Sequence, residues 1–143
     1  EALQYHPLLI KPNQEELGDI FDTKVCSKED AILYAGKLQE MGAVNVLVSF
    51  AGDGAVLVTE QGCVLQREAC AGAVVNSVGA GDSMVAGFVA GYLRECGMRK
   101  AAEPVNEEAY DRILRLAIAA GSATAFSEGL APGAVIDAML KQR

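Results

Sequence analysis

Apolar residues in the first half of the chain occur in short continuous runs, separated by stretches with helical spacing. The elements that this pattern predicts are a strand at 8–10, helices at 15–21 and 28–41, a strand at 44–50, a hairpin of strands at 55–59 and 63–66, and a short strand at 74–75. The run at 44–50 is almost entirely apolar, which is typical of a parallel strand buried on both faces. Ser27 and Asp30 have capping-box spacing and Gly42 provides a stop, so they bound the helix at 28–41.

The second half of the chain is predicted to be mostly helical. A helix at 81–95 is apolar nearly all round, so we expect it to be buried, and Gly87 and Gly91 would let a neighbouring helix approach closely. A second helix carries an apolar stripe and is followed by a terminal helix at 135–141. The residues of the stripe are Ile113, Leu116, Ala117, Ala120 and Thr124. The alternation of strands and helices predicts one α/β domain with a mainly parallel sheet flanked by helices.

Charge and composition exclude several classes of function. The 143 residues contain 12 basic and 19 acidic side chains, with a formal net charge of −7 and no basic run. Nucleic acid and anionic membrane surfaces are therefore not expected as partners. The longest apolar run, Met84 to Leu93, is much shorter than the about 20 residues that span a bilayer as a helix.

Four cysteines stand at positions 26, 63, 70 and 96, and His6 is the one histidine. The cysteine spacing does not match a zinc site, and a domain rich in Val, Leu and Ala does not need disulfides. We therefore expect buried free thiols and a cytoplasmic location. A single histidine near the start of the chain also disfavours a Ser-His-Asp hydrolase.

Asn76 to Gly87 is the most informative segment, because a glycine turn leads into a helix with one carboxylate at its start. The small residues Gly79, Ala80 and Gly81 let backbone N–H groups approach an anion, toward which the helix directs its unpaired donors. Asp82 has two interpretations. It is either an acid that the helix dipole favours, or a base that takes a proton from a substrate hydroxyl during phosphoryl transfer. The spacing fits neither a P-loop nor a dinucleotide fingerprint.

Two further segments follow predicted strands. Asn13 and Glu16 are spaced as a helix N-cap and its reciprocal N3 partner, which is a structural interpretation that stands without any ligand. The loop from Ser49 to Gly54 follows the buried strand, at the end of the sheet where open α/β folds bind ligands. An ordinary turn has the same composition, so the loop by itself does not decide between the two.

Together these segments resemble the ribokinase-like, PfkB-type family of carbohydrate kinases, and within it the 1-phosphofructokinases and tagatose-6-phosphate kinases. The residues that carry the resemblance are 76–91, Lys11-Pro12-Asn13 with Glu16, 48–55, and 123–129, in the order in which the family has them. The resemblance covers nearly all of this chain but about half of a family member. It implies that residues 1–143 are the nucleotide-binding and base-carrying C-terminal portion, and that the N-terminal sugar-binding portion is absent.

The resemblance implies a role for each candidate residue. Gly79, Ala80 and Gly81 would form an anion hole, Asp82 would be the catalytic base, and Glu16 would bind Mg²⁺ through water. The residues implied to contact ATP are Lys11, Asn13, Ser49, Phe50, Ala51, Gly52, Asp53, Gly54, Gly81, Asp82 and Ser127. Ala51 departs from the family pattern, which usually has glycine there. Ser127 lies near a helix end, so the alternative to a nucleotide contact is that its side chain bonds to the local backbone.

The implied activity is ATP-dependent phosphorylation of a sugar phosphate, with fructose 1-phosphate converted to fructose 1,6-bisphosphate as the leading expectation. Two alternatives stay open at this point. One is a kinase for tagatose 6-phosphate, another sugar or a nucleoside, and the other is a nucleotide-binding module without catalysis. A homo-oligomer is also expected of the fragment, because the apolar strand at 8–10 would be left as an open sheet edge.

Overall fold

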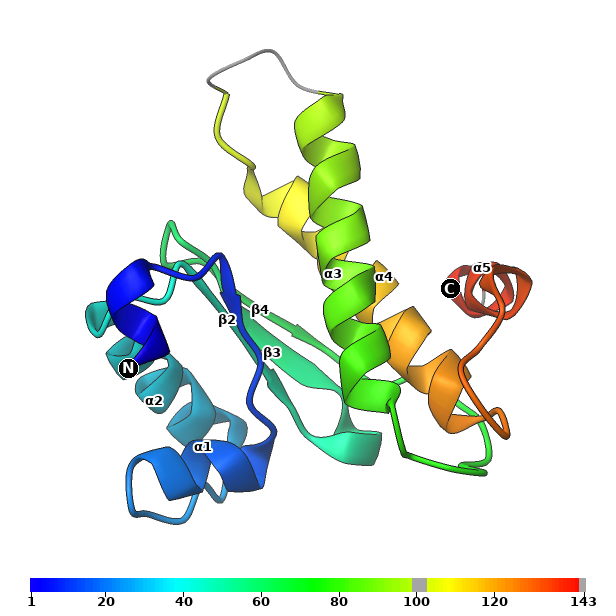
Figure 1. Ribbon diagram of the computed structural model, residues 1–143, viewed down its shortest axis with the longest axis horizontal. Coiled ribbons are helices and arrows are strands. Elements are labelled where there is room, and N and C mark those ends of the chain that lie inside the picture. Colours follow the sequence, from blue (N-terminus) through cyan, green and yellow to red (C-terminus); the bar gives the residue numbers. More distant parts are fainter. Residues whose placement is uncertain (99–102, 142–143) are drawn as a thin grey trace. The chain divides into compact units, whose positions relative to one another are not determined.

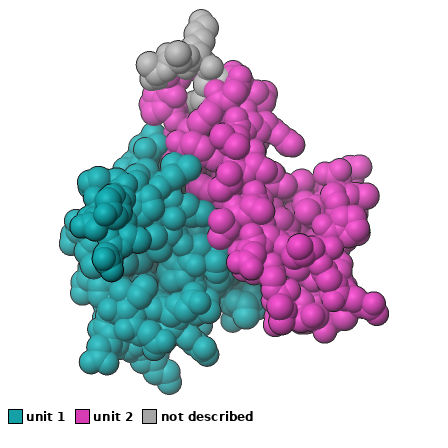
Figure 2. Space-filling view, viewed as in Figure 1, with its two compact units in different colours: residues 1–68 teal, residues 69–143 magenta. Residues whose placement is uncertain are grey.

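The computed structural model describes residues 1–98 and 103–141 of the chain. These fall into two compact units, residues 1–68 and residues 69–143 (Figure 2). The first unit holds the sheet and the second is helical (Figure 1). The elements of the first unit are the 3-10 helix η1 (Ala2–Tyr5), β1 (Leu9–Ile10), α1 (Gln14–Ile20), α2 (Lys28–Glu40), β2 (Asn45–Ser49), the 3-10 helix η2 (Ala51–Asp53), β3 (Ala55–Val58) and β4 (Val64–Arg67).

The sheet has four strands in the order β1-β2-β3-β4. The pair β1 and β2 is parallel, whereas β2 with β3 and β3 with β4 are antiparallel. The expected α/β fold and the hairpin are confirmed, but the sheet is mixed rather than mainly parallel. The reason is the loop 50–54 between β2 and β3, which is too short for the crossover of a dozen or more residues that parallel neighbours need.

Helices α1 and α2 pack on one face of this sheet and close the core of the first unit. The fully buried residues of this core include Leu17, Ala31, Ala35, Leu38, Val46, Val48 and Val56. Each large aliphatic side chain removed from water contributes about 1.5–3 kcal/mol. Leu47 and Leu57, on the opposite face of the sheet, are buried too, which explains why the middle of β2, Val46 to Val48, is apolar without alternation.

The ends of the first two α-helices follow the local signals in the sequence. Asn13 and Glu16 form a reciprocal capping box at the start of α1, and Ser27 and Asp30 form one at the start of α2. Gly42, which follows α2, has a φ of 126°, and a Cβ atom at this position would overlap with the carbonyl oxygen of Leu3. The predicted helix stop at this glycine is therefore confirmed.

The second unit contains α3 (Ala80–Gly97), α4 (Glu107–Ala125) and α5 (Gly133–Leu140). Helices α3 and α4 lie side by side and run in opposite directions (Figure 1). A Cβ atom at Gly87 would come within 2.9 Å of the Ala117 Cα, and one at Gly91 within 3.2 Å of the Ile113 Cα. The predicted close approach at both glycines is confirmed.

Two predictions for the second unit were wrong. Helix α3 is not buried all round, since Val89 and Leu93 are 39% and 65% exposed. The strand predicted at 74–75 does not form, because the Val75 N–H donates to the Ala125 carbonyl at the end of α4 (2.8 Å) instead of to a strand. An apolar pair of residues is too short to specify its own pairing, so the neighbouring helix end decided its conformation.

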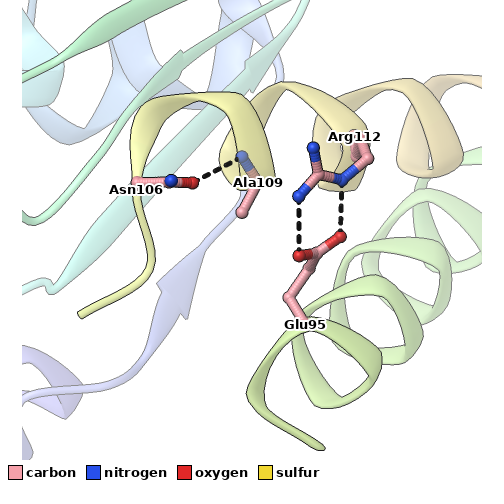
Figure 3. A network of polar contacts seen from close by, with 4 residues as sticks. All are labelled: Glu95, Asn106, Ala109 and Arg112. Carbon is pink, nitrogen blue, oxygen red and sulfur yellow. Dashed lines mark hydrogen bonds and ion pairs between the residues drawn. The ribbon is translucent and has the colours of Figure 1, made fainter. Parts of the chain in front are cut away.

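At its C-terminal end α3 is joined to the start of α4 by an ion pair (Figure 3). The carboxylate of Glu95 accepts hydrogen bonds from Nε and Nη2 of Arg112, at 2.7 and 2.9 Å. These bonds raise the pKa of the Arg112 guanidinium above its ordinary value. At the N-terminus of α4, the Asn106 side chain caps the helix by accepting from the Ala109 N–H at 3.0 Å.

The four cysteines are free, as predicted, but the prediction that they are buried was wrong. Cys26 and Cys96 are exposed, and Cys63 and Cys70 are partly buried, because all four lie near the ends of elements or in loops rather than in the core. Among the helices formed by the described residues, none combines the length and the apolarity that crossing a bilayer requires.

Candidate active site

The first group of candidate residues gathers where β1 and β2 end. The Ser49 N–H donates to the Pro12 carbonyl at 3.2 Å, and Asn13 and Ser49 form a parallel β-bridge. Since the carboxyl ends of two parallel strands meet at one edge of a sheet, Lys11 and Asn13 are brought beside Ser49. The structure thus brings these candidate residues of the first unit to one edge of the sheet.

Asn13 and Glu16 use part of their polar surface on each other. The Asn13 N–H donates to Glu16 Oε2 and the Glu16 N–H donates to Asn13 Oδ1, both at 2.8 Å. The second carboxylate oxygen of the exposed Glu16 remains open to solvent. Within the described residues, no three His, Cys, Asp or Glu side chains are grouped to hold a metal ion. Mg²⁺ usually keeps several of its waters and takes few protein ligands, and Asn13 and Glu16 are the residues that would hold those waters here.

The loop from Phe50 to Gly54 is held by its own backbone. The Phe50 N–H donates to the Gly54 carbonyl, and the Asp53 N–H donates to the Phe50 carbonyl, both at 2.9 Å. Phe50 is buried in the core of the unit, whereas Ala51, Gly52 and Asp53 are exposed. The side chain of Phe50 thus anchors the loop, and the three residues after it present their backbone to a ligand.

Two positions of this loop have positive φ angles. Gly54 has a φ of 90°, and a Cβ atom there would overlap with the Arg67 carbonyl oxygen, so only glycine fits. Ala51 has a φ of 47°, in the left-handed region that alanine occupies at a cost of about 1–2 kcal/mol. This conformation gives a physical reason for the glycine that the family usually has at this position.

The second group of candidate residues forms the start of α3. Gly79 is the N-cap, with a φ of 81° and no side chain to cap the helix. The turn before it is closed by the Asn76 side chain, which accepts from the Val78 N–H at 3.0 Å. Among the described residues, the N–H groups of Gly81 and Asp82 have no hydrogen-bond acceptor. The exposed carboxylate of Asp82 therefore lies beside two unused donors at a helix N-terminus, as an anion site with an adjacent base requires.

Thr124 in the last turn of α4 supports this group, and the sequence analysis missed its role. Its Oγ1 lies 2.8 Å from Ser83 Oγ and accepts from the Ala131 N–H at 3.2 Å. Thr124 is 1% exposed. A buried hydroxyl on an otherwise apolar stripe is the signal that indicates a specific polar partner, although it does not identify that partner.

Ser127 follows α4 and uses its side chain locally. Its Oγ donates to the Ala123 carbonyl at 2.8 Å, and its N–H donates to the Thr124 carbonyl at 3.1 Å. The alternative given for Ser127 in the sequence, a local backbone partner near a helix end, describes this arrangement. A nucleotide contact from Ser127 stays a prediction.

Comparison with known proteins tests the family resemblance independently of the site geometry. The sequence model described as "pfkB family carbohydrate kinase" matches residues 1–136. A Bacillus subtilis 1-phosphofructokinase is 44% identical over 142 residues, covering 99% of this chain and 43% of that protein. A Bacillus licheniformis D-tagatose-1-phosphate kinase is 40% identical over 143 residues, with the same coverage of both. The chain thus spans less than half the length of these relatives.

Two solved phosphofructokinase structures have a fold similar to that of this chain. A crystal structure of a candidate phosphofructokinase from Staphylococcus aureus has a TM-score of 0.80 and 41% identity, covering 99% of this chain and 42% of that one. Escherichia coli phosphofructokinase-2 in complex with substrates and products has a TM-score of 0.77 and 25% identity, covering 97% of this chain and 42% of that one.

Proposed function

Because the chain belongs to the pfkB family of carbohydrate kinases, we propose that it supplies the catalytic base and the nucleotide-binding residues of an ATP-dependent sugar-phosphate kinase. The observation that carries this proposal is the exposed Asp82 carboxylate beside the unpaired N–H groups of Gly81 and Asp82. Helix dipoles favour a carboxylate at this position in any protein, but they do not call for two free donors and a glycine N-cap next to it.

In the proposed reaction, the sugar hydroxyl gives its proton to Asp82 as its oxygen attacks the γ-phosphorus of ATP. A bond forms between that oxygen and phosphorus, and the bond from phosphorus to the bridging oxygen breaks, which releases ADP. The free N–H groups of Gly81 and Asp82, in the turn that begins at Gly79, stabilise the negative charge of the transferred group, whereas the Ala80 N–H donates to the Ser77 carbonyl at 3.2 Å.

Nucleotide binding is assigned to the residues at the ends of β1 and β2. In this proposal Lys11, directly after β1, contacts phosphates, and the exposed loop Ala51 to Asp53 offers backbone groups to ATP. Mg²⁺, when bound, neutralises phosphate charge, and Asn13 and Glu16 are the residues that would hold its waters. The candidate contacts from Phe50, Gly54 and Ser127 are backbone contacts or depend on local rearrangement, because the Phe50 side chain is buried, Gly54 has none, and the Ser127 hydroxyl donates to the Ala123 carbonyl. Ser49 is proposed to contact ATP from the end of β2.

Fructose 1-phosphate is the substrate that we propose first, with fructose 1,6-bisphosphate as the product. The support is the 44% identity to the Bacillus subtilis 1-phosphofructokinase. A second candidate is a tagatose phosphate, because the relative named D-tagatose-1-phosphate kinase is 40% identical over 143 residues. A nucleotide-binding module without catalysis is a weaker alternative, since binding alone does not require the carboxylate of Asp82.

Two broader assignments accompany this function. Escherichia coli phosphofructokinase-2 has been solved in a tetrameric inhibited form, and we propose homo-oligomerisation for the enzyme that contains this chain. We also propose a cytoplasmic location, where reducing conditions suit four free cysteines.

A chimera tests the proposed activity directly. The chain replaces the matching 43% of the Bacillus subtilis 1-phosphofructokinase, and phosphorylation of fructose 1-phosphate and tagatose phosphates by ATP is measured. We expect turnover, and a loss of about 10²–10⁴-fold in the Asp82→Asn chimera. A folded chimera that binds ATP but turns over no sugar phosphate, or an Asp82→Asn chimera with unchanged turnover, would show that the chain does not provide the base.

A further inference from the structure

The turn that precedes α3 is hydrogen-bonded on both sides to two consecutive residues at the end of α4. On its N-terminal side, the N–H groups of Val75 and Asn76 donate to the Ala125 carbonyl, at 2.8 and 3.1 Å. On its C-terminal side, Ser83 Oγ pairs with Thr124 Oγ1 at 2.8 Å. The turn is therefore held between two attachments that both come from one helix end.

Thr124 also lies near Gly79 and is bonded to a further segment of the chain. A Cβ atom at Gly79 would lie 3.9 Å from the Thr124 methyl carbon and 3.2 Å from Leu130 Cδ2. The Thr124 hydroxyl joins Ser83 to the Ala131 N–H, so it links the first turn of α3 to the segment that follows α4. A threonine hydroxyl has one donor and two acceptor positions, which suffice for both of these bonds.

The missing cap of α3 explains why such a support is needed. An Asn, Asp, Ser or Thr at an N-cap stabilises a helix by accepting from the N–H of N2 or N3. At α3 those N–H groups belong to Gly81 and Asp82, and a capping side chain would occupy the donors that an anion needs. Gly79 leaves them free, and the first turn of α3 must then be stabilised from elsewhere.

We propose that Thr124 is a positioning residue, which acts through Ser83 to hold the N–H groups of Gly81 and Asp82 and the Asp82 carboxylate in an anion-binding orientation. Its catalytic consequence rests on the kinase function proposed above, whereas its effect on anion binding by the turn does not. An ordinary structural threonine would contribute to stability alone.

The test compares Thr124→Val with Thr124→Ser and the wild-type chain. Valine keeps the shape and removes the hydroxyl, whereas serine keeps the hydroxyl. The ¹H–¹⁵N shifts of Gly81 and Asp82 are followed while sodium pyrophosphate is added, and hydrogen exchange is measured at the Ser83 amide, which donates to the Gly79 carbonyl at 2.9 Å. We expect pyrophosphate affinity about tenfold weaker and exchange about tenfold faster in Thr124→Val, and values within about threefold of wild type in Thr124→Ser.

Thr59→Val is the matched control. Thr59 is also fully buried, and its Oγ1 accepts from the Cys63 N–H at 3.2 Å in the hairpin between β3 and β4. Its replacement removes a comparable hydroxyl and lowers stability, but it should leave the shifts of Gly81 and Asp82 and their response to pyrophosphate unchanged. If Thr124→Val unfolds, Ser83→Ala removes the same hydroxyl pair from the other side and should weaken pyrophosphate binding in the same way.

In the full-length enzyme, Thr124→Val should lower kcat about tenfold while KM for the sugar phosphate stays within about threefold, with rescue by Thr124→Ser. If wild type has no kinase activity, the proposed function fails while the anion titration still decides the role of Thr124. The role is overturned if Thr124→Val, or Ser83→Ala where valine prevents folding, behaves like Thr59→Val. A wild-type turn that does not respond to pyrophosphate overturns it as well.

Discussion

The carboxylate of Glu95 and the guanidinium of Arg112 form a two-point ion pair, at 2.7 and 2.9 Å, at the end of α3 opposite to Asp82 (Figure 3). The Glu95 side chain is 10% exposed, whereas the Arg112 side chain is 55% exposed. The pair therefore fixes the relative register of α3 and α4 at one end, and Ser83 with Thr124 fixes it at the other.

Substitutions at Arg112 should separate the effect of its positive charge on stability from the effect of its two-point hydrogen bonding. Arg112→Lys keeps the positive charge but cannot form the two parallel bonds, and Arg112→Gln removes the charge beside a buried carboxylate. We expect urea midpoints in the order wild type, Arg112→Lys, Arg112→Gln, from highest to lowest. Equal midpoints in all three proteins would mean that the pair does not stabilise the helix hairpin.

Removal of the base should affect turnover much more than binding. In the intact enzyme, Asp82→Asn should lower kcat by about 10²–10⁴-fold, because the amide cannot accept the hydroxyl proton. ATP affinity, measured by calorimetry, should change by no more than a few fold. Asp19→Asn, an exposed substitution in the last turn of α1, serves as the control with unchanged kinetics. Unchanged turnover in Asp82→Asn would contradict its role as base.

Three substitutions in one loop should have three different effects on stability. Ala51→Gly should raise the free energy of unfolding by up to about 1 kcal/mol, because it relieves the left-handed conformation at a φ of 47°. Gly54→Ala should lower it by more than about 1 kcal/mol, because its methyl group would overlap with the Arg67 carbonyl. At Gly52 no described atom lies within 4 Å of an added Cβ, so Gly52→Ala should be nearly neutral. Urea denaturation measures all three, and a destabilised Ala51→Gly would contradict the strain at Ala51.

The chain should bind MgATP weakly by itself. The Ala51 to Asp53 loop is exposed and ordered by its own backbone bonds, and the Gly81 and Asp82 donors are unpaired within the described residues, so both are available to a nucleotide. Calorimetry and amide shifts at millimolar MgATP test this. The absence of heat and of shift changes in 49–54 and 79–82 would count against preformed nucleotide contacts.

The chain by itself should also self-associate. Strand β1 is an edge strand that pairs with β2 alone in the described sheet, and Leu93 on α3 is 65% exposed. Sedimentation velocity over a concentration series should show species larger than a monomer, and Leu93→Lys should reduce them if the α3 face is involved. A monomer at every concentration would contradict the expectation.

Local chemistry explains why many features were predictable from the sequence. The capping boxes at Asn13 and Ser27 depend on residues three positions apart, so the sequence determines them without knowledge of the fold. Gly42 ends α2 through its own positive φ, whereas its close approach to Leu3 depends on the fold. The sequence likewise determines the glycine turn before Asp82, whose free N–H groups follow from a helix start without a capping side chain. The candidate residues were therefore predictable as separate segments.

The tertiary structure decided the features that depend on residues distant in sequence. Ser83 and Thr124 are 41 positions apart, and their hydrogen bond exists because α3 and α4 pack antiparallel. The conformation of Val75 is set by its hydrogen bond to the Ala125 carbonyl. Leu93 is exposed because another side of α3 packs against α4. Sequence periodicity reports that a face is apolar, but only packing determines which partner covers it, because burial depends on the whole arrangement of neighbours.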